Sequence, residues 1–196
     1  MNGCIAGVDE AGRGPLAGPV FAAAVILNQN HSIKGLADSK VLSELQREKL
    51  YDQIMAYCVV GIGQASVDEI DKINILQASL LAMRRAVSQL SIQPTEVWVD
   101  GNQNPRIPYQ THLFVNGDAL YPVISAASIV AKVTRDRLMK ILDQQFPGYG
   151  LAKHKGYGTK AHIAALKTLG MSACHRKTFR VGGQVISSQQ PVIEIK

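Results

Sequence analysis

The sequence predicts an α/β domain in which helices flank a mixed central sheet. Short apolar segments bounded by glycine and proline alternate with longer segments whose apolar residues recur at helical spacing. The first two apolar segments, 3–8 and 19–27, are joined by a glycine- and proline-rich connection, which permits an antiparallel pair and hence a mixed sheet. With 196 residues, 46% of them apolar, the chain is long enough for one domain with a substantial core.

The first half of the chain is predicted to contain three strands and two helices. The strands are short, nearly continuous apolar runs, as buried strands are. The helices are recognised by apolar residues at helical spacing and, for the first of them, by a suitable N-cap. The predicted elements are, in order, strands at 3–8 and 19–27, a helix capped by Ser43, a strand at 58–65, a short acidic turn or helix at 67–73 and a helix at 74–90.

The second half is predicted to add two strands and a helical C-terminal part. Strands at 96–100 and 111–116 are separated by a loop that prolines interrupt. A long helix at 121–145 ends before Pro147-Gly148, and a shorter helix covers 160–169. We expect one domain over 1–181, with its helical C-terminal part at about 145–181, and a flexible polar tail at 182–196.

The charge of the chain favours an anionic partner. The formal net charge is +6, and the stretch 153–180 carries seven lysines and arginines without one acid, so that nucleic acid is the first candidate. The three cysteines lack metal-ligand or redox spacing and are expected to be reduced. We see no secretion signal and no apolar run that could span a bilayer, and we therefore expect a cytoplasmic protein with no membrane partner.

Carboxylates follow strand-like segments at three places. Asp9 and Glu10 end the first apolar segment, directly before a glycine-rich loop that contains Arg13, and Asp100 and Asp118 have similar settings. Convergent carboxylates are typical ligands of Mg²⁺ and Mn²⁺ in phosphodiester hydrolysis. Each acid taken alone could equally be a cap, a turn former or a surface charge. In a regular strand Asp9 and Glu10 would also point to opposite faces, so the glycine-rich turn would have to rotate Glu10.

Several longer motifs then occur in order between residue 4 and about residue 180. They are Gly7 to Val20, Asp38-Ser39-Lys40, Asn74-Ile75-Leu76, Val99 to Asn102, Gly117-Asp118, Ser125 to Asp136 and His154 to Thr159. Together they resemble the ribonuclease HII family, the type 2 ribonucleases H, which cut RNA within RNA/DNA hybrids. The resemblance implies a ribonuclease H-like sheet with a C-terminal helical extension. It also implies a monomeric, metal-dependent endoribonuclease that participates in ribonucleotide removal.

The resemblance also implies roles for individual residues. The catalytic and metal-binding acids, which would hold Mn²⁺ or Mg²⁺, are Asp9, Glu10, Asp100 and Asp118. Gly12-Arg13-Gly14 would read the 2′-hydroxyl of the scissile ribonucleotide with its backbone, and Tyr157 would stack on the next sugar. The enzyme would then cut 5′ to a lone ribonucleotide embedded in duplex DNA, leaving 3′-hydroxyl and 5′-phosphate ends.

Further substrate contacts are expected around these groups. Basic side chains would contact phosphates, which position the duplex without reading its sequence. These are Lys40, Lys132, Lys155, Arg176, Lys177 and Arg180. Ser39 and Asn74 lie in matching motifs and are also assigned to substrate binding. For Ser125 and Ser128 two roles stay open, namely close packing of the helix against the sheet and a hydroxyl that supports the site or touches the DNA strand.

Two departures from the family pattern concern selectivity and recruitment. Gly158 stands where family members often have proline, which loosens the backbone beside Tyr157. The tail contains no glutamine followed by paired aromatic residues, so docking on a sliding clamp through the tail is not expected. The chain is also too short for the extra N-terminal domain of ribonuclease HIII. Two rival functions are a non-catalytic hybrid-binding module and an integrase-like or Holliday-junction nuclease.

Other chemically suggestive residues receive structural interpretations. His154, His162 and His175 with Cys174 have poor spacing for zinc and are expected to form a surface or hybrid-contacting cluster. Asp136 lies between two arginines within the predicted helix at 121–145 and is expected to pair with them rather than to act in catalysis.

Overall fold

The computed structural model describes residues 4–28, 30, 32–37, 39–181 and 184–185. A five-stranded sheet has the order β3-β2-β1-β4-β5, and a two-stranded pair, β6-β7, is separate from it. The strands are β1 (Ile5–Ala11), β2 (Val20–Ile26), β3 (Val59–Ala65), β4 (Glu96–Asp100), β5 (Gln110–Phe114), β6 (Arg180–Val181) and β7 (Gln184–Val185). The helices are α1 (Glu44–Tyr57), α2 (Val67–Ser88), α3 (Gly117–Leu120), α4 (Pro122–Gln145), α5 (Leu151–His154) and α6 (Lys160–Leu169).

The five-stranded sheet is mixed, as the sequence predicts. β1 pairs with β2 and β2 pairs with β3 in antiparallel orientation. β1 and β4, and then β4 and β5, run parallel. β1 is therefore the central strand, and its C-terminal end lies beside the C-terminal end of β4. Sites in open α/β sheets assemble at such carboxyl ends.

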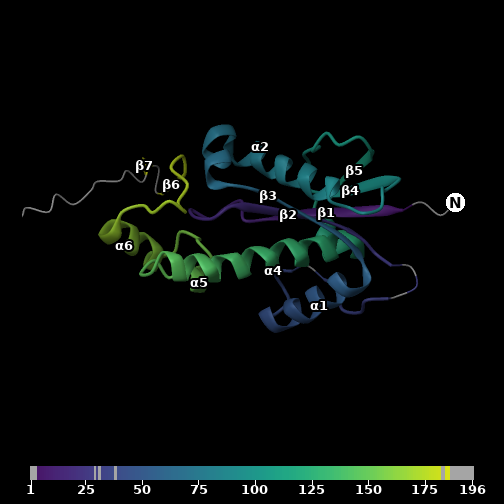
Figure 1. Cartoon of the computed structure of the whole chain (residues 1–196), viewed down its shortest axis with the longest axis horizontal. Coiled ribbons are helices and arrows are strands. Elements are labelled where there is room, and N and C mark those ends of the chain that lie inside the picture. The colour runs from purple at the N-terminus through teal and green to yellow at the C-terminus, as the bar shows by residue number, and fades with distance from the viewer. Residues whose placement is uncertain (1–3, 29, 31, 38, 182–183, 186–196) are drawn as a thin grey trace, which may run out of the picture.

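Helices cover both faces of the sheet, with α2 on one face and α4 and α1 on the other (Figure 1). The sheet separates two hydrophobic cores, and the side chains of β2 point alternately into one and the other. Ala22 packs in the core beneath α2, whereas Ala23 packs in the core with α1 and α4. Close approach of α4 to β1 requires a glycine. A Cβ atom at Gly7 would lie 2.2 Å from the carbonyl oxygen of Val123. Because Gly7 has no Cβ atom, the buried face of α4 can pack directly against β1.

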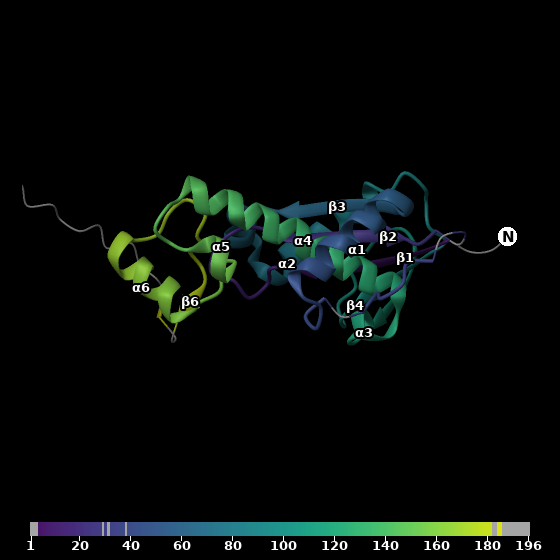
Figure 2. The same ribbon diagram turned by 90° about the horizontal axis from the view of Figure 1, so that it is seen from below.

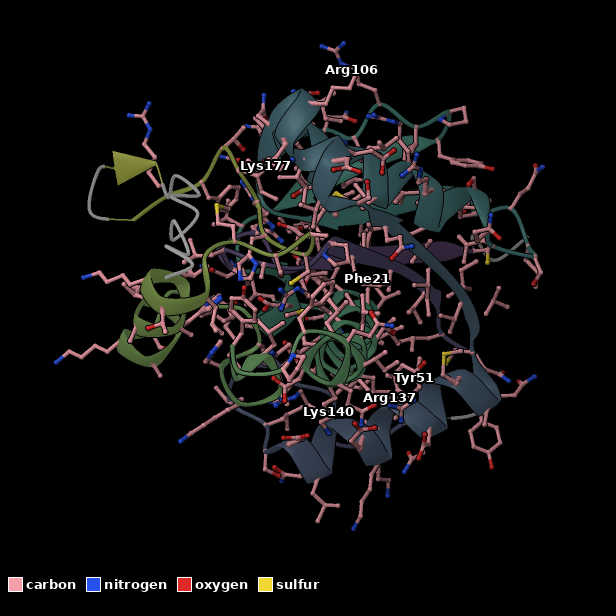
Figure 3. The ribbon with its side chains drawn as sticks, turned by 60° about the vertical axis from the view of Figure 1, so that its left-hand side comes forward. Phe21, Tyr51, Arg106, Arg137, Lys140 and Lys177 are labelled. Atoms are coloured by element: carbon pink, nitrogen blue, oxygen red, sulfur yellow. The ribbon has the colours of Figure 1, made fainter. Side chains whose placement is uncertain are left out.

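Helix α1 is fixed against α4 by apolar packing and a short row of polar contacts. Ser43 and Gln46 form a capping box at its N-terminus, which confirms Ser43 as the N-cap. The guanidinium of Arg137 lies 4.3 Å from the ring centre of Tyr51, and the two side chains meet at the seam between the helices (Figure 3). The ion pairs between α1 and α4 are exposed and contribute little to stability. The packing of α1 therefore depends mainly on its buried residues Leu50 and Ile54.

The C-terminal part packs at one end of α4 (Figure 2). Helices α5 and α6 enclose an apolar cluster that includes Leu16, Tyr149 and Leu166. Backbone bonds attach this part to the loop that follows β1, since Leu16 N–H donates to Gly156 O at 2.8 Å and Ala17 forms a β-bridge with His175. The C-terminal helical part therefore contacts the loop that follows Asp9 and Glu10.

The structure differs from the prediction at several boundaries. β1 extends to Ala11, so that Asp9 and Glu10 lie inside the strand. α2 spans residues 67–88 and is interrupted by a kink at Asn74, whose φ of 66° and ψ of 164° are not helical, so its two parts meet at the predicted junction. α5, of four residues, was not predicted because so short a helix has no periodicity. Within the predicted tail, residues 184–185 form β7, and residues 186–196 lie outside the described part of the chain.

No helix in the described part of the chain combines the length and the apolar character that crossing a bilayer requires.

Candidate active site

Two aspartates lie side by side because β1 and β4 are parallel neighbours. Val8 pairs with Val99, so Asp9 and Asp100 follow at the same level of the sheet. Asp9 is only 5% exposed, and Asp100 is half-buried. Burial raises the pKa of Asp9 well above its ordinary value, and repulsion from the charges of Glu10 and Asp100 raises it further. Negative charge is thus concentrated at this end of the sheet.

Glu10 contributes to the same site without leaving the strand. Its pairing with β2 continues through Ala11, so the predicted rotation of the backbone at Glu10 does not occur. The carboxyl groups of Asp9 and Glu10 nevertheless border one cleft. Arg13 donates to the carboxylate of Glu10 at 3.2 Å. Burial raises the pKa of Glu10, and the positive charge of Arg13 opposes part of that rise.

Asp118 is connected through the backbone to Asp100, and together with Asp9 and Glu10 these residues are called the acidic group. Gly117 N–H donates to Oδ1 of Asp100 at 2.7 Å, and this bond fixes the start of α3. The next residue, Asp118, is 4% exposed and forms an ion pair with Lys40 at 3.2 Å. Burial raises the pKa of Asp100, and the charge of Asp118 adds to the rise. Asp118 is therefore coupled electrostatically to Asp100, although it does not line the cleft itself.

The cleft has a volume of about 290 Å³ and is bordered by acids on one side and by the glycine-rich loop on the other. A Cβ atom at Gly14 would lie 3.4 Å from Cε1 of Tyr157, so the half-exposed tyrosine ring stands directly over this loop. The residues that line the cleft are Asp9, Glu10, Ala11, Gly12, Arg13, Gly14, Ser39, Lys40, Asp100, Ser128, Lys132, Arg135 and Tyr157.

The two serines of α4 have different roles. Ser128 hydrogen-bonds to Asp9, which lowers the pKa of that carboxyl, and its Oγ lies 2.9 Å from Oγ of Ser39. Ser125 instead donates to the carbonyl oxygen of Ala37 at 2.8 Å and does not line the cleft. Of the two roles left open for Ser125, these contacts favour packing, because its hydroxyl is buried and engaged in holding the segment before Ser39, and a substrate contact stays a prediction.

The glycine-rich loop passes so close to a buried arginine that it cannot carry a side chain at its first glycine. Gly12 has φ 102°, and a Cβ atom there would lie 2.1 Å from Nε of Arg135. Arg135 is 1% exposed and donates to the carbonyl oxygens of Ala17, Pro19 and Lys155. Arg135 was not among the predicted site residues, although its place in the motif Ser125 to Asp136 was a signal.

Arg176 holds the same loop and does not contact phosphate. It is fully buried and donates to the carbonyl oxygens of Gly12, Arg13 and Gly18. Burial lowers its pKa to about 9, and repulsion from Arg135 adds to the effect. The prediction of a phosphate contact for Arg176 is wrong because all of its donors face the interior of the protein.

Four other predicted contact residues are not on the lining of the cleft: Asn74, Lys155, Lys177 and Arg180, the last of which is exposed in β6. Asn74 is exposed in α2, and its Oδ1 accepts from Gln77 N–H at 3.1 Å as a helix cap. The ammonium of Lys155 donates to the carbonyl oxygen of Ala152. Lys177 lies at the surface, apart from the sheet (Figure 3). Direct contact of these residues with the reacting phosphate would require movement, whereas contact with more distant phosphates of a duplex stays a prediction.

Lys132 and Asp136 form a pair in the helix wall of the cleft. Nζ of Lys132 lies 2.7 Å from Oδ1 of Asp136, one turn further along α4. The prediction that Asp136 pairs with an arginine is therefore wrong, while its structural role is supported. Lys132 remains on the lining of the cleft. Asp38, which belongs to the same predicted motif as Ser39 and Lys40, lies outside the described residues.

Two of the three histidines of the C-terminal part, His162 and His175, are interior residues, and the third, His154, is partly buried. His162 and His175 are 0% and 1% exposed, and their Nε2 atoms lie 3.0 Å apart. The prediction of a surface or hybrid-contacting cluster is wrong because α6 and the segment after it turn these rings inward. The sequence contained a signal for this burial, because helical spacing places His162 on the same face of α6 as the apolar Leu166.

The acidic group fits a divalent cation by its chemistry. All of its donors are carboxylate oxygens, which hard cations prefer. Burial, followed by repulsion from neighbouring carboxylates, raises the pKa values of Asp9, Glu10 and Asp100, and a cation beside them would oppose both effects. Among the residues that the structure describes, no three acidic, histidine or cysteine side chains are yet grouped closely enough to hold an ion.

Comparison with known proteins agrees with the fold and with the resemblance that the sequence motifs indicate. Residues 6–181 match the family model of ribonuclease HII. A ribonuclease HII of Coxiella burnetii is 59% identical over 91% of this chain and 89% of its own. The crystal structure of ribonuclease H2 from Pyrococcus horikoshii has a TM-score of 0.74 at 29% identity, covering 89% of this chain and 93% of that chain. RNase HII of Archaeoglobus fulgidus, in a complex with PCNA, has a TM-score of 0.73 at 25% identity, covering 92% and 97%.

Proposed function

Because the chain belongs to the ribonuclease HII family, metal-dependent endoribonucleases that cleave the RNA strand of RNA/DNA hybrids, we propose that it also cuts 5′ to single ribonucleotides embedded in duplex DNA. The products would carry 3′-hydroxyl and 5′-phosphate ends. One observation supports this proposal above the others. Three of the four acids, Asp9, Glu10 and Asp100, border the same cleft of about 290 Å³ as the glycine-rich loop and Tyr157. Groups for hydrolysis and groups for recognising a sugar are thus within reach of one nucleotide.

The acids are assigned to hydrolysis. Asp9 and Asp100 lie side by side, Glu10 borders the same cleft, and Asp118 follows the backbone bond to Asp100. The residues that would hold Mg²⁺ or Mn²⁺ are Asp9, Glu10, Asp100 and Asp118, and a bound ion there would activate water and stabilise the leaving oxygen. Ser128 hydrogen-bonds to Asp9, which orients this carboxyl group and opposes part of the rise in its pKa that burial causes.

The glycine-rich loop and Tyr157 are assigned to recognition. The 2′-hydroxyl distinguishes a ribonucleotide from a deoxyribonucleotide, and backbone groups without a neighbouring Cβ atom can approach it most closely. Arg13 is half-exposed beside Glu10 and is placed to meet a phosphate. The exposed ring of Tyr157 offers a flat apolar face to the next sugar, which requires no base sequence.

The test uses a DNA duplex that contains one ribonucleotide, with and without Mn²⁺ or Mg²⁺. We expect a single cut on the 5′ side of the ribonucleotide that depends on the metal, with ends identified by ligation and by phosphatase treatment. Asp9→Asn should abolish cleavage and leave binding to the hybrid equal or stronger, because a negative charge beside phosphates is removed. Asp143→Asn in α4, away from the cleft, is the matched control and should cleave normally.

Each rival function predicts a different result. A non-catalytic hybrid-binding module would bind the duplex without cutting it under any metal condition. A nuclease for branched DNA would cut without regard to the ribonucleotide. If Asp9→Asn cleaves at nearly the wild-type rate, the assignment of the acids is wrong.

Recruitment by a sliding clamp is not part of this proposal. The Archaeoglobus relative is in a complex with PCNA. In the present sequence, residues 182–196 contain no aromatic residue and hence no paired aromatics after a glutamine. We propose that the enzyme acts as a monomer and engages its substrate without a clamp contact through this segment.

A further inference from the structure

A buried chain of hydrogen bonds connects the C-terminal segment to the backbone of Tyr157. Ser172 N–H donates to Nδ1 of His175 at 3.0 Å. Nε2 of His175 lies 3.0 Å from Nε2 of His162, and Nδ1 of His162 lies 3.0 Å from the carbonyl oxygen of Tyr157. Both histidines are buried, at 1% and 0% exposure.

The two ends of this chain determine where its hydrogens lie. Nδ1 of His175 accepts a hydrogen from the backbone of Ser172, so the ring carries its hydrogen on Nε2 and donates it to His162. A carbonyl oxygen cannot donate, so His162 must carry its hydrogen on Nδ1 to bond Tyr157, which leaves its Nε2 as the acceptor. Both ends therefore require the same pair of neutral tautomers.

The surroundings favour these neutral rings. His154 stacks on His162 with ring centres 4.4 Å apart, and Tyr149 packs on His175 at 4.8 Å. Cys174, with its thiol 3.1 Å from Oγ of Ser172, completes the titratable groups that face the chain. Burial lowers the pKa of His162 and lowers that of His175 to about 4. An extra proton would place two N–H groups against each other and break the chain.

The bond from His162 restrains the segment of backbone that carries Tyr157. The ring of Tyr157 is exposed, so packing alone does not hold it over Gly14. Its carbonyl oxygen accepts from Thr159 N–H at 2.8 Å and from His162. The following residue is Gly158, which restrains the peptide less than any other residue type would. The histidine bond acts at the place where the sequence itself supplies least stiffness.

We propose that His162 and His175 are positioning residues that hold Tyr157 over the glycine-rich loop through this chain of hydrogen bonds, and thereby set the preference for a ribonucleotide that is followed by a deoxyribonucleotide. The inference rests on the proposed contact between Tyr157 and the sugar. The histidines do not touch the substrate; they act through the carbonyl group of Tyr157.

The test compares two substrates, a DNA duplex with one ribonucleotide and a uniform RNA/DNA hybrid. The measured quantity is the ratio of kcat/KM on the first substrate to kcat/KM on the second, with kcat and KM determined separately. His162→Phe keeps a ring of similar size and removes the donor, and should lower the ratio about tenfold, equivalent to about 1.4 kcal/mol. His162→Asn can present an amide N–H near the position of Nδ1 and should recover most of the ratio.

Two further variants separate positioning from loss of folding. Leu166→Ala removes a buried side chain of the same helix, and should lower the unfolding temperature while leaving the ratio unchanged. His175→Phe breaks the chain one bond earlier, so it should lower the ratio in the same direction and by less than His162→Phe. In the Tyr157→Ala background, His162→Phe should lower the ratio no further.

A spectroscopic measurement on the wild-type protein tests the chain without any variant. The ¹⁵N shifts of the imidazoles at pH 7 should show His162 protonated at Nδ1 and His175 protonated at Nε2. The opposite tautomer at either ring would overturn the inference, as would an unchanged ratio for His162→Phe when Tyr157→Ala lowers it; in both cases the proposed function stands. If Tyr157→Ala itself leaves the ratio unchanged, the sugar contact proposed for Tyr157 is wrong, and the inference is overturned with it.

Discussion

Arg176 offers the sharpest test of how the glycine-rich loop is held. Arg176→Met keeps the length and the apolar stem of the side chain but removes every donor of the guanidinium. Three carbonyl oxygens, those of Gly12, Arg13 and Gly18, then lose the bonds that they accept at 2.6–3.0 Å. The loop keeps its sequence and its glycines, so any effect on it comes from the loss of these bonds.

The expected loss of stability follows from two opposing effects. A buried polar group without a partner destabilises a protein by about 1–3 kcal/mol, so three orphaned carbonyl oxygens give about 3–9 kcal/mol. Methionine does not carry the buried charge whose desolvation lowers the pKa of Arg176 to about 9, which offsets part of that loss. We therefore expect the free energy of unfolding to fall by about 3–5 kcal/mol, in the lower half of the range.

The assay is equilibrium unfolding in urea, followed by circular dichroism at pH 7. Lys177→Met is the matched control, because the neighbouring lysine is exposed and its side chain can be replaced without orphaning a buried group. The control should change the free energy of unfolding by no more than about 0.5 kcal/mol. A loss below about 1 kcal/mol for Arg176→Met would refute the reasoning, since it would mean that water or backbone movement satisfies the three carbonyl groups.

Three further predictions concern pH, sterics and salt. Folding lowers the pKa of His175 from about 6.5 to about 4, so the unfolded state binds more protons below pH 6.5 and stability is lost as the pH falls. This residue should make the free energy of unfolding in urea about 2 kcal/mol lower at pH 5 than at pH 7. His175→Gln should reduce that difference. Gly12→Ala should abolish cleavage of embedded ribonucleotides in a gel assay, because its Cβ would meet Arg135 at 2.1 Å; normal activity would show that the loop adapts. Binding of a hybrid, measured by fluorescence anisotropy, should weaken with salt with a log–log slope of about −2 to −3. A flat response would contradict phosphate contacts by the solvent-accessible cations on the lining of the cleft. These cations are Arg13, Lys40 and Lys132.

The sheet and the acidic group were predictable because local sequence determines them. Apolar runs bounded by glycine and proline identify the strands, and the short connection between β1 and β2 favours their antiparallel pairing. Parallel pairing of β1 with β4 then brings Asp9 beside Asp100, which strand-end position alone suggests. The continuation of β1 past Glu10 was not predictable, since it depends on pairing with β2 rather than on the composition of the segment.

The roles of the basic residues were less predictable because a cation gives the same local signal at the surface and in the interior. Arg176 and Lys177 are neighbours in a basic stretch, yet one is fully buried and the other exposed. A guanidinium can be buried without a carboxylate only where several carbonyl oxygens converge on it, and this convergence arises from tertiary structure. The same reasoning applies to His162, whose acceptor is a backbone carbonyl.

The consecutive residues His175 and Arg176 connect these observations. Arg176 reaches the carbonyl oxygens of the glycine-rich loop, and His175 reaches Tyr157 through His162. The backbone of His175 is itself bridged to Ala17, on the far side of the loop. One short segment thus holds both parts of the proposed sugar-recognition site in a fixed relation to each other. It follows that changes in the C-terminal part should alter substrate selectivity even where they lie far from the carboxylates that we propose for hydrolysis.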